Sequence, residues 1–318
     1  MLKAIRSLAP GSRGSTPVGI SLNRALAVAV MPRSGLPAVH IRELPTEPAA
    51  QIKSLAGVVT ELGLRGSPTA ITLSPGTYSL LQVDRPAVED AELVDAARWL
   101  IANSLDYPVD EAVIQVFDGP QPNERLRTPM LNVIAAPARS VRELAGTVRR
   151  AGLTPERITV AEMAIRELAT AASNSDEAVA TVFLAGRQGI ILVTRNGEIQ
   201  LSRRLDYGLN SVKPVDVLAT GIHGTLPLEL RRTIDYFDSH FAAGGIHRIL
   251  AGPAEQNFMA FMRQASDVIG LPVSALELAA DLKPAPSKTP DYGLPEAYFA
   301  LGGAATLYGD SHEAQIAT

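Results

Sequence analysis

Residues 178–205, AVATVFLAGRQGIILVTRNGEIQLSRRL, are the stretch from which the fold can be predicted. They contain three runs of β-branched and apolar residues, at Ala178–Leu184, Gly189–Thr194 and Glu198–Leu205. Asn196-Gly197 separates the last two runs, and Asn-Gly between such runs is the strongest short signal for a two-residue hairpin. The stretch therefore predicts three consecutive strands at the start of the second half of the chain.

The first half of the chain opens in the same way. Three β-rich runs, at Val18–Leu22, Arg24–Met31 and Ala38–Glu43, precede residues 49–62, whose apolar residues have the spacing of one helix face. Two halves that each open with three strands and continue with helices suggest the duplicated α/β architecture of the actin and sugar-kinase ATPases. Three-stranded meanders are common, so this pattern by itself is weak evidence.

The composition indicates an ordered chain and argues against several functional classes. Its 318 residues are 46% hydrophobic and 19% charged, which supplies enough apolar surface for roughly two domains. The net charge of −4 does not provide the basic surface that nucleic acid requires. Cysteine is absent, which excludes disulfides and cysteine-based metal or catalytic sites. No apolar run approaches the ~20 residues of a membrane span, so we expect a cytoplasmic protein without a transmembrane segment.

The residues that follow Asp84-Arg85-Pro86 predict an inserted subdomain, residues 84–152, with the element order α-β-β-α. Its predicted elements are a helix at Glu89–Leu105, strands at Val113–Phe117 and Met130–Ala135, and a helix at Val141–Ala151.

Two turn-rich segments predict the remaining boundaries. Pro75-Gly76 predicts a hairpin between Thr69–Leu73 and Tyr78–Val83. The polar run at residues 172–176 predicts the linker between the two halves. We therefore expect a first lobe at residues 15–172, which includes the insert, and a second lobe at residues 177–295.

Several short segments, in order along the chain, resemble PilM and the MshI-type proteins of type IV and MSHA pilus systems. The most specific is Leu228–Phe237, LELRRTIDYF, which is similar to a family helix that ends in a Ser/Thr-Leu-Asp-Tyr-aromatic run. The resemblance implies an FtsA/PilM-like, bilobal actin-like α/β fold with two RNase H-like lobes and a C-terminal helix, residues 296–318, that returns to the first lobe. The other matching segments are Gly19–Asn23, Arg85-Pro86, Ala97–Trp99, Asp106–Val109, Ile249–Pro253 and Leu301–Ala304.

The resemblance places the nucleotide cleft of this family at Ser21, Asn23, Gly186, Gly189 and Gly252. In a working ATPase of this fold, Asp residues position Mg²⁺ and water. Ser21 and Phe183 stand where the family has Asp, and Asn23 stands where it has glycine. Pro253 replaces one glycine of the adenosine turn and removes an N–H donor. We therefore expect no ATP hydrolysis, no catalytic residues and no cofactor, with ATP and Mg²⁺ bound weakly if at all.

The resemblance implies a scaffold or adaptor at the cytoplasmic face of the inner membrane rather than an enzyme. Its partner would be the cytoplasmic N-terminal tail of a PilN-like inner-membrane protein, held in an extended form between the first lobe and the insert. The pilus assembly ATPase is a further partner that the resemblance allows. The residues expected to contact the tail are Val83, Arg85, Pro86, Trp99 and Tyr107.

Two rival functions stay open: an active actin-like ATPase, and a small-molecule enzyme outside this fold. The missing carboxylates oppose the first, and the lack of an acid–base constellation opposes the second. The five histidines have no metal-binding spacing, so no metal site is expected. Arg203-Arg204 and Arg231-Arg232 either hold phosphate or lie on solvated faces. Trp99 is either a partner-facing anchor or part of the core.

Overall fold

The computed structural model describes residues 16–32, 34–120, 128–173, 176–212, 222–241, 244–278, 280–283 and 294–308. The chain divides into two compact units. Unit 1 consists of residues 1–119, 130–164 and 279–318, and unit 2 consists of residues 120–129 and 165–278. The chain therefore leaves unit 1 to build unit 2 and returns to unit 1 at its end.

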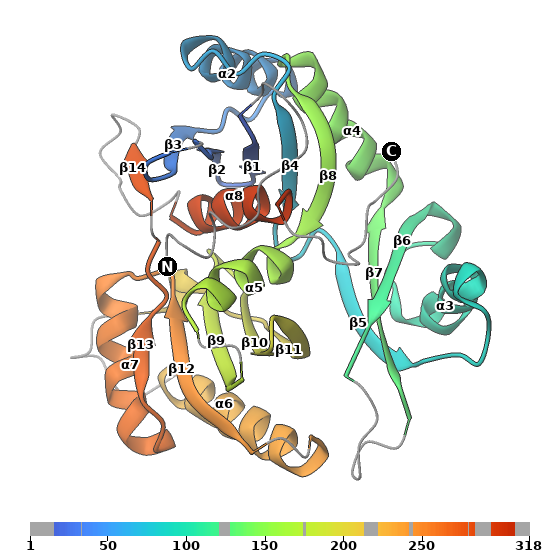
Figure 1. The fold of residues 1–318 in the computed structure, drawn as a ribbon, viewed down its shortest axis with the longest axis vertical. Coiled ribbons are helices and arrows are strands. Elements are labelled where there is room, and N and C mark those ends of the chain that lie inside the picture. Colours follow the sequence, from blue (N-terminus) through green and yellow to red (C-terminus); the bar gives the residue numbers. More distant parts are fainter. Residues whose placement is uncertain are drawn as a thin grey trace. The chain divides into compact units, whose positions relative to one another are not determined.

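The main sheet of unit 1 has six strands. They are β1 (Val18–Leu22), β2 (Ala25–Val30), β3 (Ala38–Glu43), β4 (Pro68–Leu73), β8 (Thr154–Val160) and β14 (Asp281–Lys283). Their order is β14-β3-β2-β1-β4-β8 (Figure 1). β1, β2 and β3 form the predicted antiparallel meander, β4 runs parallel to β1, and β8 runs parallel to β4.

The sheet of unit 2 has five strands. They are β9 (Ala178–Leu184), β10 (Gly189–Arg195), β11 (Glu198–Leu205), β12 (Ile246–Gly252) and β13 (Val273–Ala275), in the order β11-β10-β9-β12-β13. The predicted hairpin joins β10 to β11. Asn196 and Gly197 have φ angles of 54° and 77°, and positive φ at both central residues is what a type I′ turn requires.

The two sheets share one topology. The order β3-β2-β1-β4-β8 matches β11-β10-β9-β12-β13, and corresponding neighbours run in the same relative directions. Each half of the chain thus builds three antiparallel strands and adds two parallel ones. The duplication predicted from the two meanders is confirmed.

Three helices accompany the main sheet of unit 1: α2 (Pro48–Glu61), α4 (Ala138–Arg150) and α8 (Leu294–Thr306). α2 and α4 pack side by side, and α4 also contacts β8. α8 lies across β1, β2 and β4 (Figure 1). Nearly all of its residues are buried, which explains why this helix is apolar on every side rather than amphipathic.

Two helices, α6 (Ile222–His240) and α7 (Gln256–Ile269), pack together in unit 2 and share its core with the sheet. The side chain of Glu255 caps α7 by accepting a hydrogen bond from the N–H of Phe258 (2.8 Å), and Gly270 ends the helix with a φ of 81°. A further helix, α5 (Ala161–Ala171), crosses the boundary between the units. Among the described residues, no helix combines the length and the apolar character that crossing a membrane requires.

The insert of unit 1 is a separate three-stranded sheet with one helix. It consists of β5 (Ser79–Asp84), α3 (Leu93–Ile101), β6 (Ala112–Asp118) and β7 (Met130–Pro137), with the strand order β5-β7-β6. Leu93, Ala97 and Ile101 of α3 pack against Leu131 and Val133 of the sheet. Short 3₁₀ turns at Asp90–Glu92, Ala102–Ser104 and Val109–Glu111 connect these elements.

The hairpin predicted around Pro75-Gly76 is wrong. β4 pairs with β1 and β8 in the main sheet, whereas β5 pairs with β7 in the insert. All six residues of β4 are buried, which suits a strand inside a parallel sheet, while β5 is only partly buried. The turn therefore passes the chain from one sheet to another.

The predicted boundaries of the insert and lobes also differ from the structure. β5 joins the insert sheet, and α4 packs with α2 and β8, so the order of the insert is β-α-β-β rather than α-β-β-α. The main part of unit 2 begins at Ile165, within α5, instead of after the 172–176 linker. β14 pairs with β3, so the chain has already returned to unit 1 at Asp281–Lys283. The sequence had placed these residues in the second lobe.

Candidate functional site

The first predicted phosphate turn joins β1 to β2. Ser21 is completely buried near the carboxyl end of β1, and Asn23 is exposed in the turn. The N–H of Asn23 donates to the C=O of Ala25 (3.3 Å). The N–H of Arg24 donates to Oε1 of Glu296, at the start of α8 (3.3 Å). This turn, where the fold would present an N–H group to phosphate, therefore already holds a carboxylate from its own unit.

Helix α8 brings this carboxylate to the turn because it lies very close to the sheet. A Cβ atom on Gly19 would lie 1.8 Å from the carbonyl oxygen of Ala300. A Cβ atom on Gly303 would lie 2.2 Å from Oγ1 of Thr72. Both distances are far below van der Waals contact, so only glycine permits this approach. These two glycines thus set the position of α8 over β1 and β4.

The carboxyl group of Glu296 is in an unusual electrostatic environment. Glu296 is only 2% exposed to solvent. Burial raises the pKa of this carboxyl group from 4.5 to about 7, against the smaller opposing effects of the N–H groups of Glu296 and Arg24 and of the Arg24 charge. Its Oε2 atom, and the hydroxyl of Ser21, have no hydrogen-bond partner among the described residues. Ser21 lies on the same face of β1 as Gly19, which faces α8, because side chains alternate along a strand.

Sequence reasoning missed Glu296. A signal was present, because Glu296 is the single charged residue in residues 294–306, which are otherwise apolar, small or aromatic. A carboxylate in a helix that is buried on all sides needs a partner or a raised pKa.

The second predicted phosphate turn, residues 185–188, joins β9 to β10 and contains Gly186. The segment that follows β11 packs on this turn through two backbone hydrogen bonds. The N–H of Leu209 donates to the C=O of Ala185 (2.7 Å), and the N–H of Asn210 donates to the C=O of Gly186 (2.9 Å). A Cβ atom on Gly208 would lie 2.0 Å from the carbonyl oxygen of Ala185, so this contact also depends on a glycine. The turn is therefore covered by a neighbouring segment of unit 2.

Packing explains the other two glycines predicted for the cleft. A Cβ atom on Gly189 would lie 2.6 Å from Cδ2 of Leu184. A Cβ atom on Gly252 would lie 2.9 Å from Cδ2 of Phe183, which is completely buried and pairs with Gly252 in the register of β9 and β12. Gly186, Gly189 and Gly252 therefore meet at one edge of the unit 2 sheet. A phenyl ring occupies the position predicted to hold a carboxylate in an active relative.

The residues predicted to contact a partner lie in the insert. Val83 and Tyr107 are partly buried and pack against the insert core. Arg85, just after β5, forms ion pairs with Asp90 (2.6 Å) and with Asp118. Because β5 is the end strand of its sheet, its outer edge pairs with no other described strand. An unpaired strand edge is a template for binding an extended peptide.

Tyr107 contributes its ring rather than its hydroxyl to the insert. The hydroxyl is buried without a hydrogen-bond partner among the described residues. Burial raises the pKa of this phenol, and the negative charge of Asp106 raises it further.

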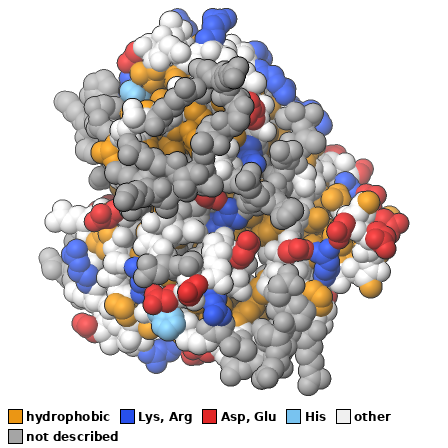
Figure 2. All heavy atoms as spheres, viewed as in Figure 1, with side chains coloured by type: hydrophobic (Ala, Val, Ile, Leu, Met, Phe, Trp, Pro, Cys, Tyr) orange, Lys and Arg blue, Asp and Glu red, His pale blue; other side chains and the backbone are white. Residues whose placement is uncertain are grey.

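Trp99 points away from the insert core. It is 81% exposed, and its neighbour Leu100 is 52% exposed, whereas Ala97 on the same helix is buried. Figure 2 shows hydrophobic side chains bordered by acidic ones over the part of the surface where α3 lies in Figure 1. Trp99 is therefore not part of the core, and its contact with a partner stays a prediction. Val83, by contrast, is partly buried against the insert core.

A polar cluster in unit 2 engages two of the predicted arginines. Arg203 and Arg232 both form ion pairs with Glu229, at 2.9 Å and 2.7 Å. The hydrogen bond from Arg203 is the main cause that lowers the pKa of Glu229. Burial, with the charge of Glu229, raises the pKa of Tyr207 to about 12. These arginines neutralise a carboxylate of their own unit, which opposes the phosphate interpretation.

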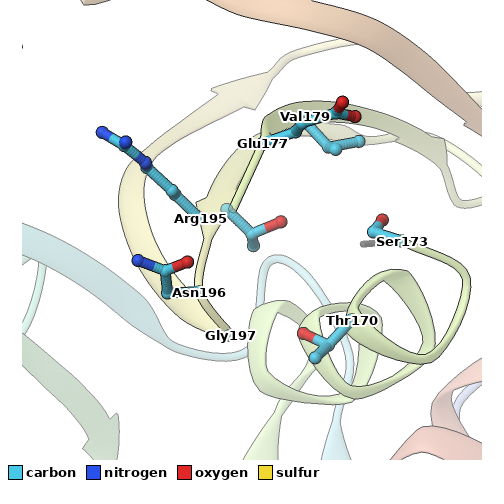
Figure 3. Close-up of a pocket in the computed structure, with 8 residues that line it drawn as sticks. Thr170, Ser173, Glu177, Val179, Arg195, Asn196 and Gly197 are labelled. Carbon is cyan, nitrogen blue, oxygen red and sulfur yellow. The ribbon is translucent and has the colours of Figure 1, made fainter. Parts of the chain in front are cut away.

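A small hollow lies between the end of α5 and the β10–β11 hairpin. Figure 3 shows Thr170 and Ser173 on one side of it and Arg195 and Asn196 on the other. It contains none of the predicted site residues. In the part of the chain that the structure describes, no group of three or more His, Cys, Asp or Glu side chains is placed to hold a metal ion.

No protein-family model and no curated protein matches this chain. Solved structures do match. A chain of a PilM–PilN type IV pilus biogenesis complex superimposes with a TM-score of 0.68 at 18% sequence identity, and the match covers 92% of this chain and 98% of that chain.

Two further structures have the same architecture. A Bacteroides thetaiotaomicron protein with an actin-like ATPase fold matches with a TM-score of 0.55 at 9% identity, over 84% of this chain and 93% of that one. The cytoplasmic domain of EpsL, an inner-membrane component of the Vibrio cholerae type II secretion system, matches with a TM-score of 0.53 at 10% identity, over 96% and 98%. At these identities the likeness is one of fold. The chain therefore has the actin-like ATPase fold, in a PilM-like form.

Proposed function

We propose that this chain is a scaffold or adaptor of a type IV pilus assembly platform of the MSHA type. It would act at the cytoplasmic face of the inner membrane and bind the cytoplasmic tail of a PilN-like protein. The observation that carries this proposal is the match to a chain of the PilM–PilN complex over 92% of this chain and 98% of that one. Because the match covers nearly the whole of both chains, it includes the insert.

The edge of β5 is the surface that we propose for the tail. Main-chain hydrogen bonds along residues 79–84 would hold an extended peptide, and side chains near the end of the strand would choose its sequence. Val83 and Tyr107 offer partly buried apolar surface there, and Arg85 and Pro86 follow directly. This mode of binding needs no catalytic residue.

We further propose that the nucleotide site is degenerate. Three contacts support this: Glu296 accepts the Arg24 N–H, Asn210 covers the turn at Gly186, and Phe183 fills the space beside Gly252. Phosphate at the first turn would have to displace the carboxyl group of Glu296 from the Arg24 N–H. Purified protein incubated with Mg-ATP should release no phosphate above a buffer control. Steady turnover that follows the protein through successive columns would instead favour the rival function, an active ATPase.

Calorimetric titration with the cytoplasmic peptide of the PilN-like protein tests the proposed tail binding. The double variant Arg85→Glu, Tyr107→Ala should bind about tenfold more weakly or worse, since anchors of this kind are worth 1–2 kcal/mol or more. Arg139→Glu is the matched control for Arg85→Glu. It makes the same charge change at an exposed position on α4, and it likewise removes an ion pair, the one with Glu143.

Hydrogen exchange gives a second readout of the same binding. The amides of residues 79–84 that face the open edge should exchange more slowly once the peptide is bound. Equal affinity in a folded double variant, together with unchanged exchange in β5, would move the tail to another surface.

A further inference from the structure

The outward face of α3 carries two large apolar side chains in contact with solvent. Trp99 is 81% exposed and Leu100 is 52% exposed. Single exposed apolar residues are ordinary on a protein surface, but adjacent ones, with a tryptophan among them, are typical of binding sites. Burial of the opposite face of the helix, through Leu93, Ala97 and Ile101, fixes this orientation.

The surface around these two side chains is acidic. Between residues 84 and 118 the basic residues are Arg85 and Arg98 alone, among many Asp and Glu residues. Arg85 is engaged by two carboxylates, and Arg98 donates to the carbonyl oxygen of Val109 (2.8 Å). Acidic residues therefore outnumber basic ones in this segment, the side chain of Arg98 is directed to a backbone carbonyl rather than to a carboxylate, and Figure 2 shows carboxylates beside the hydrophobic surface.

Helical spacing places particular carboxylates next to the apolar pair. Asp95 precedes Trp99 by four residues, so the two side chains are neighbours on the helix surface, and Glu92 is one turn further along the same face. Both carboxylates are exposed, and neither forms an ion pair with a described residue. An indole face beside a free carboxylate attracts a cation in two ways, through the ring quadrupole and through charge.

We propose that this face binds a basic amphipathic segment of a protein partner. An Arg or Lys side chain of the segment stacks on Trp99 and pairs with Asp95, and an apolar neighbour packs on Leu100. A membrane rich in anionic lipid does not fit, because its charge has the same sign as the surface. The site is on the exposed face of α3, whereas the surface proposed above for the tail is the edge of β5, so the two proposals can be tested separately.

Trp99 reports on its own site, because it is the only tryptophan in the chain. The probe is a synthetic amphipathic helical peptide with arginine on its polar face, and its twin has glutamate at the same positions. The arginine peptide should shift the Trp99 emission to the blue, saturably, as the indole leaves water. The shift should weaken as salt is raised, because the attraction is between exposed charges. The glutamate twin should leave the emission unchanged.

Variants that keep Trp99 separate this site from general attraction to an acidic protein. Asp95→Asn should weaken peptide binding about two- to fivefold, the range for one exposed ion pair, and Leu100→Ala by a similar factor. Glu198→Gln and Val268→Ala, at exposed positions in unit 2, are the charge and apolar controls and should have no effect.

The proposal would be overturned by no shift with the arginine peptide, by equal binding of the glutamate twin, or by full affinity in folded Asp95→Asn and Leu100→Ala proteins. A shift that appears with rising protein concentration, without peptide, would assign the face to a second copy of this chain and would also overturn it.

Discussion

Replacing Glu296 with glutamine tests the electrostatics of the β1–β2 turn. Glutamine keeps the size of the side chain and an oxygen that accepts the Arg24 N–H, and it removes the charge. In the folded protein the pKa of Glu296 is raised from 4.5 to about 7. The folded state therefore keeps a proton that the unfolded state has lost between these two pH values, and the stability of the wild type falls as pH rises through this window.

The difference between the two pKa values corresponds to about 3 kcal/mol, an order-of-magnitude figure for a residue that is almost completely buried. Glu296→Gln does not titrate there, so its advantage over the wild type should be small at pH 5 and should approach ~3 kcal/mol at pH 8. Urea unfolding followed by far-ultraviolet circular dichroism at both pH values measures this difference.

The comparison between pH values isolates Glu296, because all other titrating groups are common to the two proteins. Glu198→Gln, at an exposed position on β11, is the control for the same change of side chain outside the site. A difference that is equal at both pH values would refute the reasoning. A wild type more stable than the variant at pH 8 would also refute it, since Glu296 would then be a well-satisfied carboxylate.

Three further predictions follow from single contacts. Gly19→Ala should lower the melting temperature by several degrees in a calorimetric scan, because its Cβ atom would lie 1.8 Å from the carbonyl oxygen of Ala300 and overpacking costs about 1–3 kcal/mol or more. Gly146→Ala is the control: the atom nearest to its Cβ lies at 4.0 Å, so the change should be neutral or stabilising. In an ultraviolet titration of the wild type, Tyr207 should ionise only near pH 12, and Tyr207→Phe should remove this step. The variant should lose little stability, because the hydroxyl has no hydrogen-bond partner among the described residues. Trp99→Ala should leave the free energy of unfolding within about 0.5 kcal/mol of the wild type, and a loss near 3 kcal/mol would show that the ring is in fact packed.

Local chemistry was enough to predict the elements that depend on it. The β10–β11 hairpin follows from Asn196-Gly197, because few other residues adopt positive φ at both central positions of a turn. The duplication follows from the two meanders, whose strands are consecutive in the sequence. α2 was predicted within a residue of its ends from its apolar spacing.

Features that depend on distant partners could not be predicted in this way. Pro75-Gly76 correctly marks a turn, but a turn signal does not say which strand the chain joins next, and β5 joins the insert. β13 and β14 have three residues each, too few for any periodicity, and are defined by their partners β12 and β3. In the candidate site, the resemblance singled out Ser21 and Phe183 as replacements of carboxylates, and this stays a prediction. The carboxylate that occupies the first turn comes from 272 residues away, and only the folded chain reveals it.

The return of the chain to unit 1 determines the order in which the protein can mature on the ribosome. Thr72 donates its hydroxyl to the carbonyl of Phe299, and these residues are 227 positions apart. At synthesis rates of about 5–20 residues per second, β4 would wait on the order of ten to forty-five seconds for α8. Unit 2 is nearly continuous in sequence, so it becomes complete first although it begins later. Until α8 emerges, one face of the first sheet is uncovered, and nascent chains stalled before residue 294 should be held by chaperones or degraded. A truncation that removes α8 would therefore act on the folding of the N-terminal sheet.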